Sequence, residues 1–462
     1  MHMSAGGLAL ALAVAAAPAT GSAAQPPEGN HQVLADIAAR VDPAAQRAVI
    51  ETLVGFGTRH TASDTASATR GIGAARRWVK GRFEEIGRDC GGCLQIDTPS
   101  TTVTGQRLPQ PTEIVDVLAV QRGTTDPDRV VVISGHVDSR VTDVMDATSD
   151  APGANDDGSG VAAVIEAARV LSRYRFAATI VYAVLSGEEQ NLYGGKLLAE
   201  TAKARGWRVE ADLNNDIVGN IQGQGGVVDN THVRIFSEGT KAVETPAQAN
   251  RRRYNGGEVD SPSRNLARYM DGLAAQYLTN LSVRMVYRTD RFGRGGDQVA
   301  MLDAGYPAVR VTEATENYTR QHQDVRTDQG VAYGDVISGV DFPYLAQVTR
   351  QNAITLASLA GAPAPPSGVQ TEGAVTPDTK VSWTPVPGAA GYRVWWRDTT
   401  SPRWTDSRWA GDAASLTLQG VNIDDLFFGV SAVSSDGFAS PVVFPGAAGA
   451  FESPPAPTAP AP

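Results

Sequence analysis

Residues 130–140 read VVVISGHVDSR, residues 152–160 read PGANDDGSG, and residues 185–189 read LSGEE. Apolar and β-branched residues come directly before the polar residues of the first and third runs, as is typical of buried parallel strands. In an open α/β sheet, ligands bind beyond the carboxyl ends of the strands. Because imidazole and carboxylate groups together suit zinc, the three runs predict a metal-dependent hydrolase.

Strand-like and helical segments alternate on both sides of these runs. The candidate strands are residues 113–119, 130–134, 179–185 and 308–311, and the candidate helices are residues 160–174, 194–205, 264–277 and 344–360. Helices of this length between strands predict an α/β fold with a mostly parallel central sheet flanked by helices. Residues 221–255 are rich in glycine, asparagine and charge, and we expect them to form an insertion or a long loop.

A second unit follows the α/β domain, which we expect to cover residues 25–361. Residues 362–368 predict a proline-rich linker. In residues 369–450, runs such as VSWTPVPGAAGYRVWWR alternate apolar and polar residues without a helical period, which predicts a small all-β sandwich. This segment resembles fibronectin type III domains, with Trp383 and Tyr392 as core aromatics. The low-complexity tail, residues 451–462, is expected to be disordered.

The composition and the N-terminal residues restrict the binding partners of this protein and the compartment in which it is expected. A net charge of −10 and a pI near 5.2 argue against nucleic acid or an anionic membrane surface as the main partner. Residues 1–24 combine a short apolar core with the small residues Ser22, Ala23 and Ala24, which predicts a signal peptide and a secreted or periplasmic protein. The apolar core is too short to span a bilayer, and no other stretch of the sequence is long enough.

The two cysteines restrict the metal chemistry. Cys90 and Cys93 are separated by two glycines and follow an amphipathic helical pattern. In an exported protein, this spacing favours a local disulfide over a redox site. Two cysteines cannot build a zinc site, so a bound metal must use histidine, aspartate and glutamate.

The first candidate ligands follow the strand at residues 130–134. His136 and Asp138 alternate along the chain, so both side chains point to the same side, and Asp138 can orient a ligand from behind the histidine. Asp156 and Asp157 lie in a glycine-rich turn before a helix, where helix capping is the alternative explanation. Since one carboxylate can bridge two cations about 3.5–4 Å apart, we assign that bridge to Asp156.

Four further candidates follow other strands. Glu188 and Glu189 are adjacent, so their side chains must diverge, and one can bind metal while its neighbour faces the substrate water. A solvated acidic turn is the alternative. Asp216 follows another candidate strand, and His322 lies in ENYTRQHQDVRTD at residues 316–328. The chain has only six histidines, so two at plausible ligand positions are informative.

Taken in order, GHVDS, PGANDDGSG, LSGEE, NND and QHQD resemble the motifs of peptidase family M28, the co-catalytic dizinc aminopeptidase group. The similarity extends from about residue 46 to residue 360. The resemblance implies a phosphorylase/hydrolase-like α/β sandwich with two Zn²⁺ ions. It also suggests a cis peptide bond between Asp156 and Asp157.

The resemblance assigns roles to the candidate residues. It implies that Glu188 is the general base and that Asp138 is the aspartate behind the ligand histidine. The zinc ligands that it implies are His136 and Asp216 for one ion, Glu189 and His322 for the other, and Asp156 as the bridge between them.

The sequence departs from the family pattern at two places. Where members often carry an SDH-like run, this chain reads GGDQ, with Asp297 and Gln298. Some aminopeptidases place a tyrosine directly before the last histidine, whereas this chain has Gln321 there and Tyr318 four residues ahead of the histidine. Tyr318 is therefore only a weak candidate for stabilising an oxyanion.

These residues predict hydrolysis of peptide or protein substrates by metal-activated water, with an aminopeptidase as the leading expectation. A carboxypeptidase on the same scaffold would use arginines for a terminal carboxylate, and Arg291 and Arg294 lie in the suggestive run RTDRFGRGGD. A glutaminyl cyclase usually binds one zinc ion, so the presence of both His136 and Asp216 disfavours it. The remaining alternative is a non-catalytic binding protein in which the all-β unit holds a polymer or a cell surface.

Overall fold

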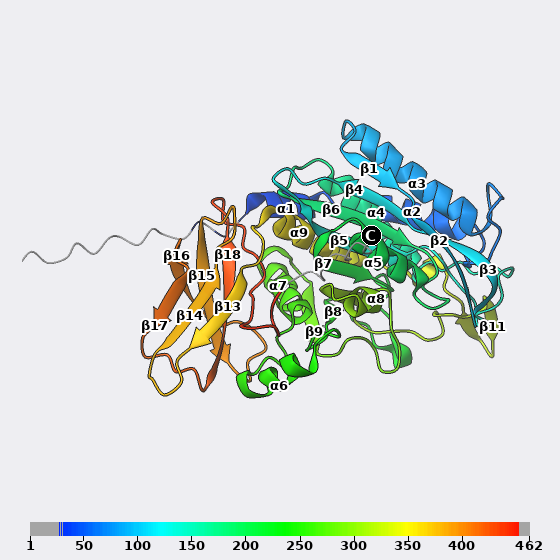
Figure 1. The fold of residues 1–462 in the computed structure, drawn as a ribbon. Coiled ribbons are helices and arrows are strands. Elements are labelled where there is room, and N and C mark those ends of the chain that lie inside the picture. The colour runs from blue at the N-terminus through cyan, green and yellow to red at the C-terminus, as the bar shows by residue number, and fades with distance from the viewer. Residues whose placement is uncertain (1–26, 28, 30, 452–462) are drawn as a thin grey trace, which may run out of the picture.

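One mixed sheet of eight strands forms the centre of the computed structural model, which describes residues 27, 29 and 31–451 (Figure 1). Its strand order is β1 (Leu94–Asp97), β4 (Val117–Gln121), β6 (Ala178–Leu185), β5 (Asp126–His136), β7 (Arg208–Asn215), β10 (Ala308–Glu313), β8 (His232–Phe236) and β9 (Ser282–Val286). The central strands β6, β5, β7 and β10 are parallel, and antiparallel pairs lie toward both edges. The predicted α/β fold with a mostly parallel central sheet is confirmed.

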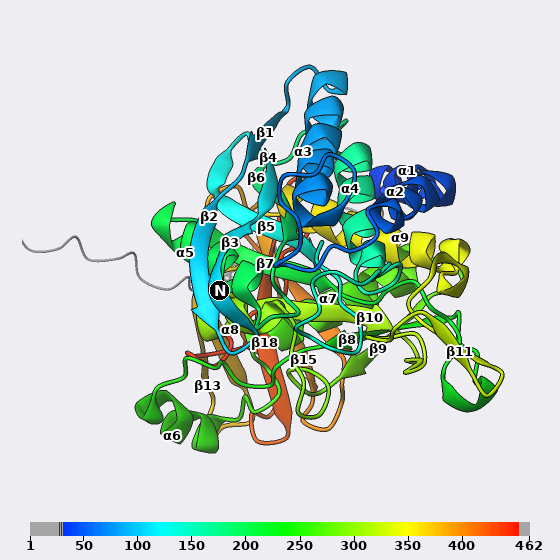
Figure 2. The same cartoon turned by 90° about the vertical axis from the view of Figure 1, so that its right-hand side faces the viewer.

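Helices cover both faces of the sheet (Figure 2). One face carries α1 (Gln32–Ala39), α2 (Pro43–Gly55), α3 (Gly71–Asp89), α4 (Gly158–Leu171), α7 (Pro262–Tyr277) and α9 (Phe342–Gly361), and the other carries α5 (Tyr193–Ala204) and α8 (Gln298–Asp303). In β5, Val131 and Ile133 pack into the first core, and Val130 and Val132 pack into the second. Because both faces are buried, the run from Val130 to Ile133 in β5 is apolar without alternation.

The first turn of helix α4 packs closely against the carboxyl edge of the sheet. Asp157 caps the helix by accepting a hydrogen bond from the Gly160 amide at 2.9 Å. A Cβ at Gly160 would collide with the Asn215 carbonyl oxygen and with the Asp157 carboxylate. Glycine at this position therefore lets the first turn of α4 lie directly against the ends of β5 and β7, where the candidate ligands are.

The C-terminal unit consists of two antiparallel sheets that pack against each other. The strand orders are β13 (Ser367–Glu372), β14 (Thr379–Thr384), β17 (Ser415–Leu418) in one sheet, and β16 (Asp406–Gly411), β15 (Gly391–Asp398), β18 (Leu426–Val433) in the other. Trp383 and Tyr392 lie in the core between the sheets, with ring centroids 5.3 Å apart. The predicted small all-β unit is present, and its likeness to fibronectin type III domains stays a prediction.

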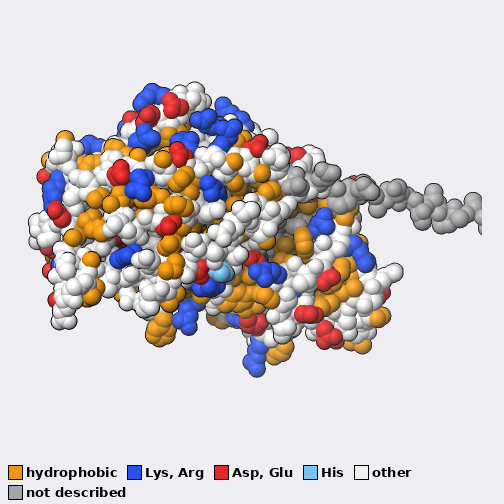
Figure 3. Space-filling view, turned by 180° about the vertical axis from the view of Figure 1, so that it is seen from behind, with side chains coloured by type: hydrophobic (Ala, Val, Ile, Leu, Met, Phe, Trp, Pro, Cys, Tyr) orange, Lys and Arg blue, Asp and Glu red, His pale blue; other side chains and the backbone are white. Residues whose placement is uncertain are grey.

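A buried ion cluster joins the two units. Asp260 is fully buried and accepts hydrogen bonds from Arg268 at 2.9 Å and from Arg397 of β15 at 2.8 and 2.9 Å. Tyr269 of α7 donates to the Ala439 carbonyl at 2.9 Å, and His31 stacks on Phe438 at 3.8 Å. On the face that Figure 3 shows, acidic and basic side chains are interspersed over both units.

Residues 221–255, expected to form an insertion or a long loop, instead contain a strand of the main sheet and a helix. Strand β8 is only five residues long, and Val233, Ile235 and Phe236 are its buried positions, so its pattern was too short to recognise. Helix α6 (Pro246–Asn255) begins at a capping box formed by Thr245 and Gln248. The short helix η1 (Gln224–Gly226) lies in the same segment.

The remaining elements lie outside the main sheet. The candidate strand at 113–119 is divided between β3 (Leu108–Val115), which pairs with β2 (Ser100–Gly105) in a hairpin, and β4. The other short elements are β11 (Arg326–Asp328), β12 (Val331–Tyr333) and η2 (Ile337–Gly339).

Two smaller predictions are confirmed, whereas those for the signal peptide and for nearly all of the C-terminal tail fall on residues that the structure does not describe. Cys90 and Cys93 form a disulfide directly after α3, and the peptide bond between Asp156 and Asp157 is cis. Within the described residues, none of the helices has both the length and the apolarity that crossing a bilayer requires. The signal peptide predicted at residues 1–24 lies outside those residues.

Candidate metal centre

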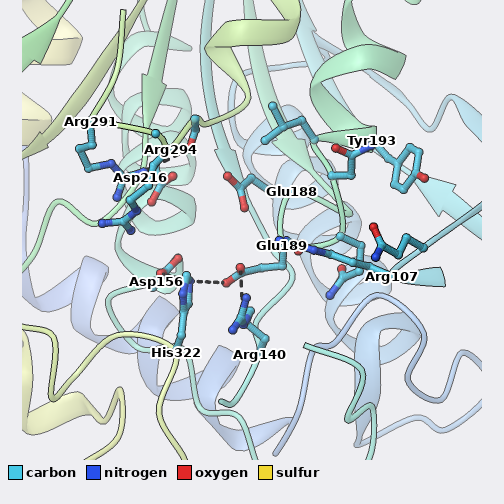
Figure 4. Close-up of a pocket in the computed structure, with 16 residues that line it drawn as sticks. Arg107, Arg140, Asp156, Glu188, Glu189, Tyr193, Asp216, Arg291, Arg294 and His322 are labelled. Atoms are coloured by element: carbon cyan, nitrogen blue, oxygen red, sulfur yellow. Dashed lines mark hydrogen bonds and ion pairs between the residues drawn. The ribbon is translucent and has the colours of Figure 1, made fainter. Parts of the chain in front are cut away.

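The predicted metal-site residues gather at the carboxyl edge of the parallel strands. His136 is the last residue of β5, Asp216 directly follows β7, and Glu189 lies in the loop after β6. Because neighbouring parallel strands end at the same edge, residues far apart in sequence meet there. Figure 4 shows five of the candidates around one cavity: Asp156, Glu188, Glu189, Asp216 and His322.

Asp156 lies between the two histidines. One of its carboxylate oxygens is 3.3 Å from His136 Nε2, and the other is 3.0 Å from His322 Nε2. His136 Nε2 is also 4.0 Å from Asp216, and His322 Nε2 is 3.1 Å from Glu189. The carboxylate therefore presents one oxygen to each of two adjacent groups, which is the arrangement that a bridging ligand needs.

The side chains form two groups in which possible ligand atoms lie within 4.8 Å of one another. The groups are His136, Glu188 and Asp216, and Asp156, Glu189 and His322. The first group contains Glu188, which the family resemblance treats as the base rather than as a ligand. The structure thus places the Glu188 carboxylate within 4.8 Å of the possible ligand atoms of His136 and Asp216.

The donor atoms fit zinc. His136 Nε2 and Glu189 Oε1 are buried and make no hydrogen bond with any described residue, although polar atoms lie 3.3 and 3.1 Å away. A buried polar atom left without a partner costs about 1–3 kcal/mol, and one cation in each of the two groups would satisfy these atoms. Although burial opposes the charged imidazolium, Glu189 and Asp156 raise the pKa of His322 to about 10, which shows how strongly the centre favours positive charge.

Asp138 organises the loop that carries the two glutamates. Its carboxylate accepts hydrogen bonds from the amides of Gly187 at 2.8 Å, Glu188 at 3.3 Å and Glu189 at 3.1 Å. Its backbone oxygen lies 3.0 Å from His136 Nδ1, whereas its carboxylate lies 3.6 Å from the same nitrogen. Asp138 therefore lies behind the histidine as expected, and it also fixes the loop after β6.

Asp157 has a structural position, in agreement with the capping alternative. Besides capping α4, it accepts hydrogen bonds from the amides of His136 at 3.0 Å and Ile217 at 3.3 Å. These contacts tie the ends of β5 and β7 to the helix, so the second aspartate holds the frame of the centre while Asp156 faces the cavity.

Two residues of the centre were not found from the sequence. Arg310 is fully buried in β10, and its guanidinium lies 2.5 Å from the Asp216 carboxylate. Asp335 accepts hydrogen bonds from the amides of Asn155 at 2.9 Å and Asp156 at 2.6 Å, so it positions the bridging candidate. An arginine inside the apolar run AVRVTE was the available signal for the first, and no local pattern marks the second.

His60 and Tyr318 lie outside the centre. His60 is buried; its Nδ1 accepts from the Ala62 amide at 3.1 Å and its Nε2 lies 2.9 Å from the Val144 carbonyl. Tyr318 is 57% exposed and does not line the cavity, so the structure gives no support for an oxyanion role.

The cavity at the centre has a volume of about 510 Å³. Its acidic lining residues are Asp156, Glu188, Glu189 and Asp216, and its basic ones are Arg107, Arg140, Arg291, Arg294 and His322. Burial raises the pKa of Glu188 well above its ordinary value, and the nearby carboxylates of Asp216 and Glu189 raise it further, while His136 opposes them. A raised pKa makes the carboxylate a stronger proton acceptor, which is what a general base requires.

Comparison with known sequences gives a consistent family. Residues 116–331 match the model of peptidase family M28. A "probable zinc metalloprotease" of Leptosphaeria maculans is 45% identical over 402 residues, which cover 86% of this chain and 93% of the relative. A "probable zinc metalloprotease" of Pyrenophora teres f. teres is 42% identical over 427 residues, covering 91% of this chain and 88% of the relative.

Solved structures share the fold at low sequence identity. The LapA aminopeptidase of Legionella pneumophila superposes with a TM-score of 0.51 and 17% identity, covering 74% of this chain and 78% of that one. LapB of the same organism gives a TM-score of 0.51 and 18% identity, covering 72% and 77%. These likenesses extend over most of the chain and concern the fold alone.

Proposed function

This chain belongs to peptidase family M28 and is a zinc metallopeptidase of that family, and from that premise we propose that it is a dizinc aminopeptidase that releases N-terminal residues from peptides. One observation carries the proposal: five of the six candidate side chains line one cavity of about 510 Å³, and the sixth, His136, lies beside it with its Nε2 3.3 Å from Asp156. That volume falls within the range of about 300–1,000 Å³ for small-ligand sites. It suits the end of a peptide better than the middle of an extended chain.

The residues that would hold the ions are those named by motif: His136 and Asp216 for one, Glu189 and His322 for the other, and Asp156 for both. Bound zinc would lower the pKa of a water and polarise the scissile carbonyl. Arg310 keeps the Asp216 carboxylate in place through its ion pair at 2.5 Å. Asp138 holds the backbone amides of Glu188 and Glu189, so both side chains are aimed before substrate arrives.

Glu188 is the proton carrier in this proposal. Its carboxylate takes a proton from the attacking water and delivers it to the leaving amine, so the C–N bond breaks without release of a strongly basic anion. Its raised pKa, caused first by burial, brings the proton affinity of the carboxylate closer to that of the groups between which it must act.

The test is the Glu188→Gln variant, which keeps the shape and removes the proton acceptor. We expect turnover of an aminoacyl chromogenic amide to fall by at least about 10²-fold, which is the low end for general base catalysis, while two zinc ions stay bound. The matched control is Glu200→Gln, a change of the same chemistry at an exposed position on α5. Turnover within tenfold of the wild-type value would reject Glu188 as the base.

A carboxypeptidase is the second candidate, because Arg291 and Arg294 line the cavity and could hold a terminal carboxylate. Peptides blocked at one end distinguish the two candidates. Cleavage that stops on N-acetylation supports the aminopeptidase, and cleavage that stops on C-terminal amidation supports the carboxypeptidase.

We also propose that the protein is exported, either secreted or periplasmic, because residues 1–24 have the pattern of a signal peptide. Mass analysis of the N-terminus after expression in a secreting host tests this proposal. Removal of residues 1–24 is the expected result, and retention of Met1 in the recovered protein would contradict it.

A further inference from the structure

Four arginines line the cavity, and they form two pairs that differ in how far carboxylates neutralise their positive charge. Figure 4 shows Arg291 and Arg294 on the Asp216 side and Arg107 and Arg140 on the Glu189 side. The contacts of each pair show which guanidinium groups already have carboxylate partners and which remain available to a ligand.

The pair on the Asp216 side has carboxylate partners. Arg294 lies 2.9 Å from Glu316, and Arg291 lies 3.0 Å from Asp290 and 3.7 Å from Glu316. Arg291, Arg294 and a third arginine hold the pKa of Glu316 down to about 2 against the effect of its burial, so this carboxylate remains charged. These contacts offset part of the positive charge of the pair, since Glu316 also pairs with Arg234 at 2.8 Å and Asp290 lies 3.7 Å from Arg310.

The pair on the Glu189 side donates hydrogen bonds to backbone carbonyl groups instead. Arg107 donates one hydrogen bond, to the Glu189 carbonyl at 2.8 Å, and Arg140 donates to the carbonyls of Val141 and Thr142, both at 3.1 Å. Within the described chain, the nearest carboxylate partner that either arginine has is Glu189, 4.0 Å from Arg140. A guanidinium has five N–H donors, so both side chains keep donors for a ligand.

Arg107 is held in place although its side chain is exposed. It lies at the turn of the β2–β3 hairpin, directly before Leu108. Leu108 is buried with Ile114 of the same hairpin and Leu197 of α5. The turn is thereby anchored to the α/β domain, and the arginine is carried to the cavity by an ordered support.

We propose that Arg107 and Arg140 form a carboxylate-binding site for the substrate, either for an acidic side chain or for the free C-terminus of a short peptide. The inference deepens the proposed peptidase function and rests on it. Guanidinium groups bind carboxylates through charge-assisted hydrogen bonds. The four acids that line the cavity all belong to the candidate metal centre, so bound zinc would offset them and leave the two arginines as uncompensated positive charge.

Paired substrates distinguish the two sources of the carboxylate. Glutamyl and glutaminyl 4-nitroanilides differ only in side-chain charge, and a dipeptide and its amide differ only at the C-terminus. We expect KM for the charged member of one pair to be about tenfold lower, the smallest effect expected of a hydrogen bond to a charged group. Arg107→Gln should abolish that difference, Arg107→Lys should restore part of it, and the uncharged members should change less than twofold.

Two control variants separate charge in general from charge at this site. Arg82→Gln removes a positive charge on α3 away from the cavity, and Arg294→Gln removes one that Glu316 offsets. Both should leave the difference between charged and uncharged substrates at more than half of its wild-type value. Loss of the same size in Arg82→Gln, or no difference between the members of either pair in the wild type, would overturn the inference.

A binding measurement keeps this test separate from that of the proposed function. Titration calorimetry with glutarate, on both zinc-free and zinc-loaded protein, needs no turnover. At least tenfold weaker binding to Arg107→Gln than to the wild type and to Arg82→Gln supports the carboxylate site, even if no aminoacyl or blocked peptide is cleaved and the peptidase proposal fails. Equal binding to all three proteins overturns the carboxylate site, even if peptides are cleaved.

Discussion

The candidate metal centre and the junction with the C-terminal unit both bury carboxylates, but they differ in what surrounds the charge. At the junction, both oxygens of Asp260 accept hydrogen bonds from arginine. In the centre, His136 Nε2 and Glu189 Oε1 are buried without a hydrogen bond among the described residues. At the junction the chain itself satisfies the carboxylate, although Arg397 Nε is left without a hydrogen bond among the described residues, whereas the centre leaves a metal-ligating nitrogen and oxygen for a ligand to satisfy.

Asp212 of β7 is a third case that makes the comparison sharper. It is fully buried, accepts one hydrogen bond from Ser134 at 2.8 Å and has no arginine or histidine partner among the residues described. Burial raises its pKa to about 7. This carboxyl group therefore keeps its proton in weakly acidic solution. Protonation is thus a third way to bury a carboxyl group, besides pairing it with arginine or leaving it for a bound cation.

The largest effect is expected from Asp156→Asn, which removes the negative charge between the two histidines. Activity should fall by about 10³-fold or more, since loss of a metal ligand also removes the chemistry that the ion supplies. Elemental analysis should find fewer than two zinc ions per chain. Asp328→Asn, at an exposed position on β11, is the control and should keep both. Two bound zinc ions in Asp156→Asn would contradict the bridging assignment.

Asp260→Ala tests the other side of the comparison. It leaves Arg268 and Arg397 buried without their carboxylate, and the free energy of unfolding should fall by about 3–5 kcal/mol. Urea denaturation measures the change. Zinc content and KM should stay at wild-type values in the protein that remains folded. A loss below about 1 kcal/mol would mean that the junction tolerates the unpaired arginines.

Asp212→Asn tests the protonated carboxyl group through pH. The folded-state pKa of Asp212 is about 7, above the ordinary value of 3.8. The stability that its protonated form contributes is therefore complete below pH 3.8 and is lost as pH rises through 7. The wild type should lose about 2 kcal/mol relative to the variant between pH 5 and pH 7. Urea denaturation of both proteins at several pH values measures this difference. Parallel pH profiles for the two proteins would show that Asp212 is already ionised at pH 5.

The smallest effect is expected from Glu51→Gln. Glu51 and Arg47 form an ion pair at 3.8 Å on α2, and more than half of each side chain is exposed. Water screens such a pair, so the free energy of unfolding should change by about 0.5 kcal/mol or less. A thermal melt at low and at high salt is sufficient to measure it. A change as large as that of Asp260→Ala would show that burial does not separate the two kinds of ion pair.

Much of the fold was predictable because its signals are local. The apolar runs at residues 130–134 and 179–185 lie within β5 and β6, and the glycine-rich run at residues 152–160 leads into α4. The edge strands were harder to predict. β8 is only five residues long, with three buried apolar positions, and β1 has no fully buried residue, so neither has enough periodicity to be recognised.

The candidate site divides in the same way. The chemical identity of the centre follows from short motifs, since each of them combines a strand end with an imidazole or carboxylate group. The contacts of Arg310 with Asp216 and of Asp335 with the Asp156 amide join segments about a hundred or more residues apart, and no local pattern encodes them. The position of Arg107 at the cavity depends on where a hairpin packs.

The sequence by itself therefore determined the α/β class, the all-β unit and the residue types that can hold a metal, because periodicity and strand-end motifs depend on neighbours along the chain. Only the tertiary structure decided which buried charges are neutralised and which remain available to a ligand. The physical reason is that the free energy of a buried charge depends on its few nearest atoms, and these come from whichever elements the strand order brings together.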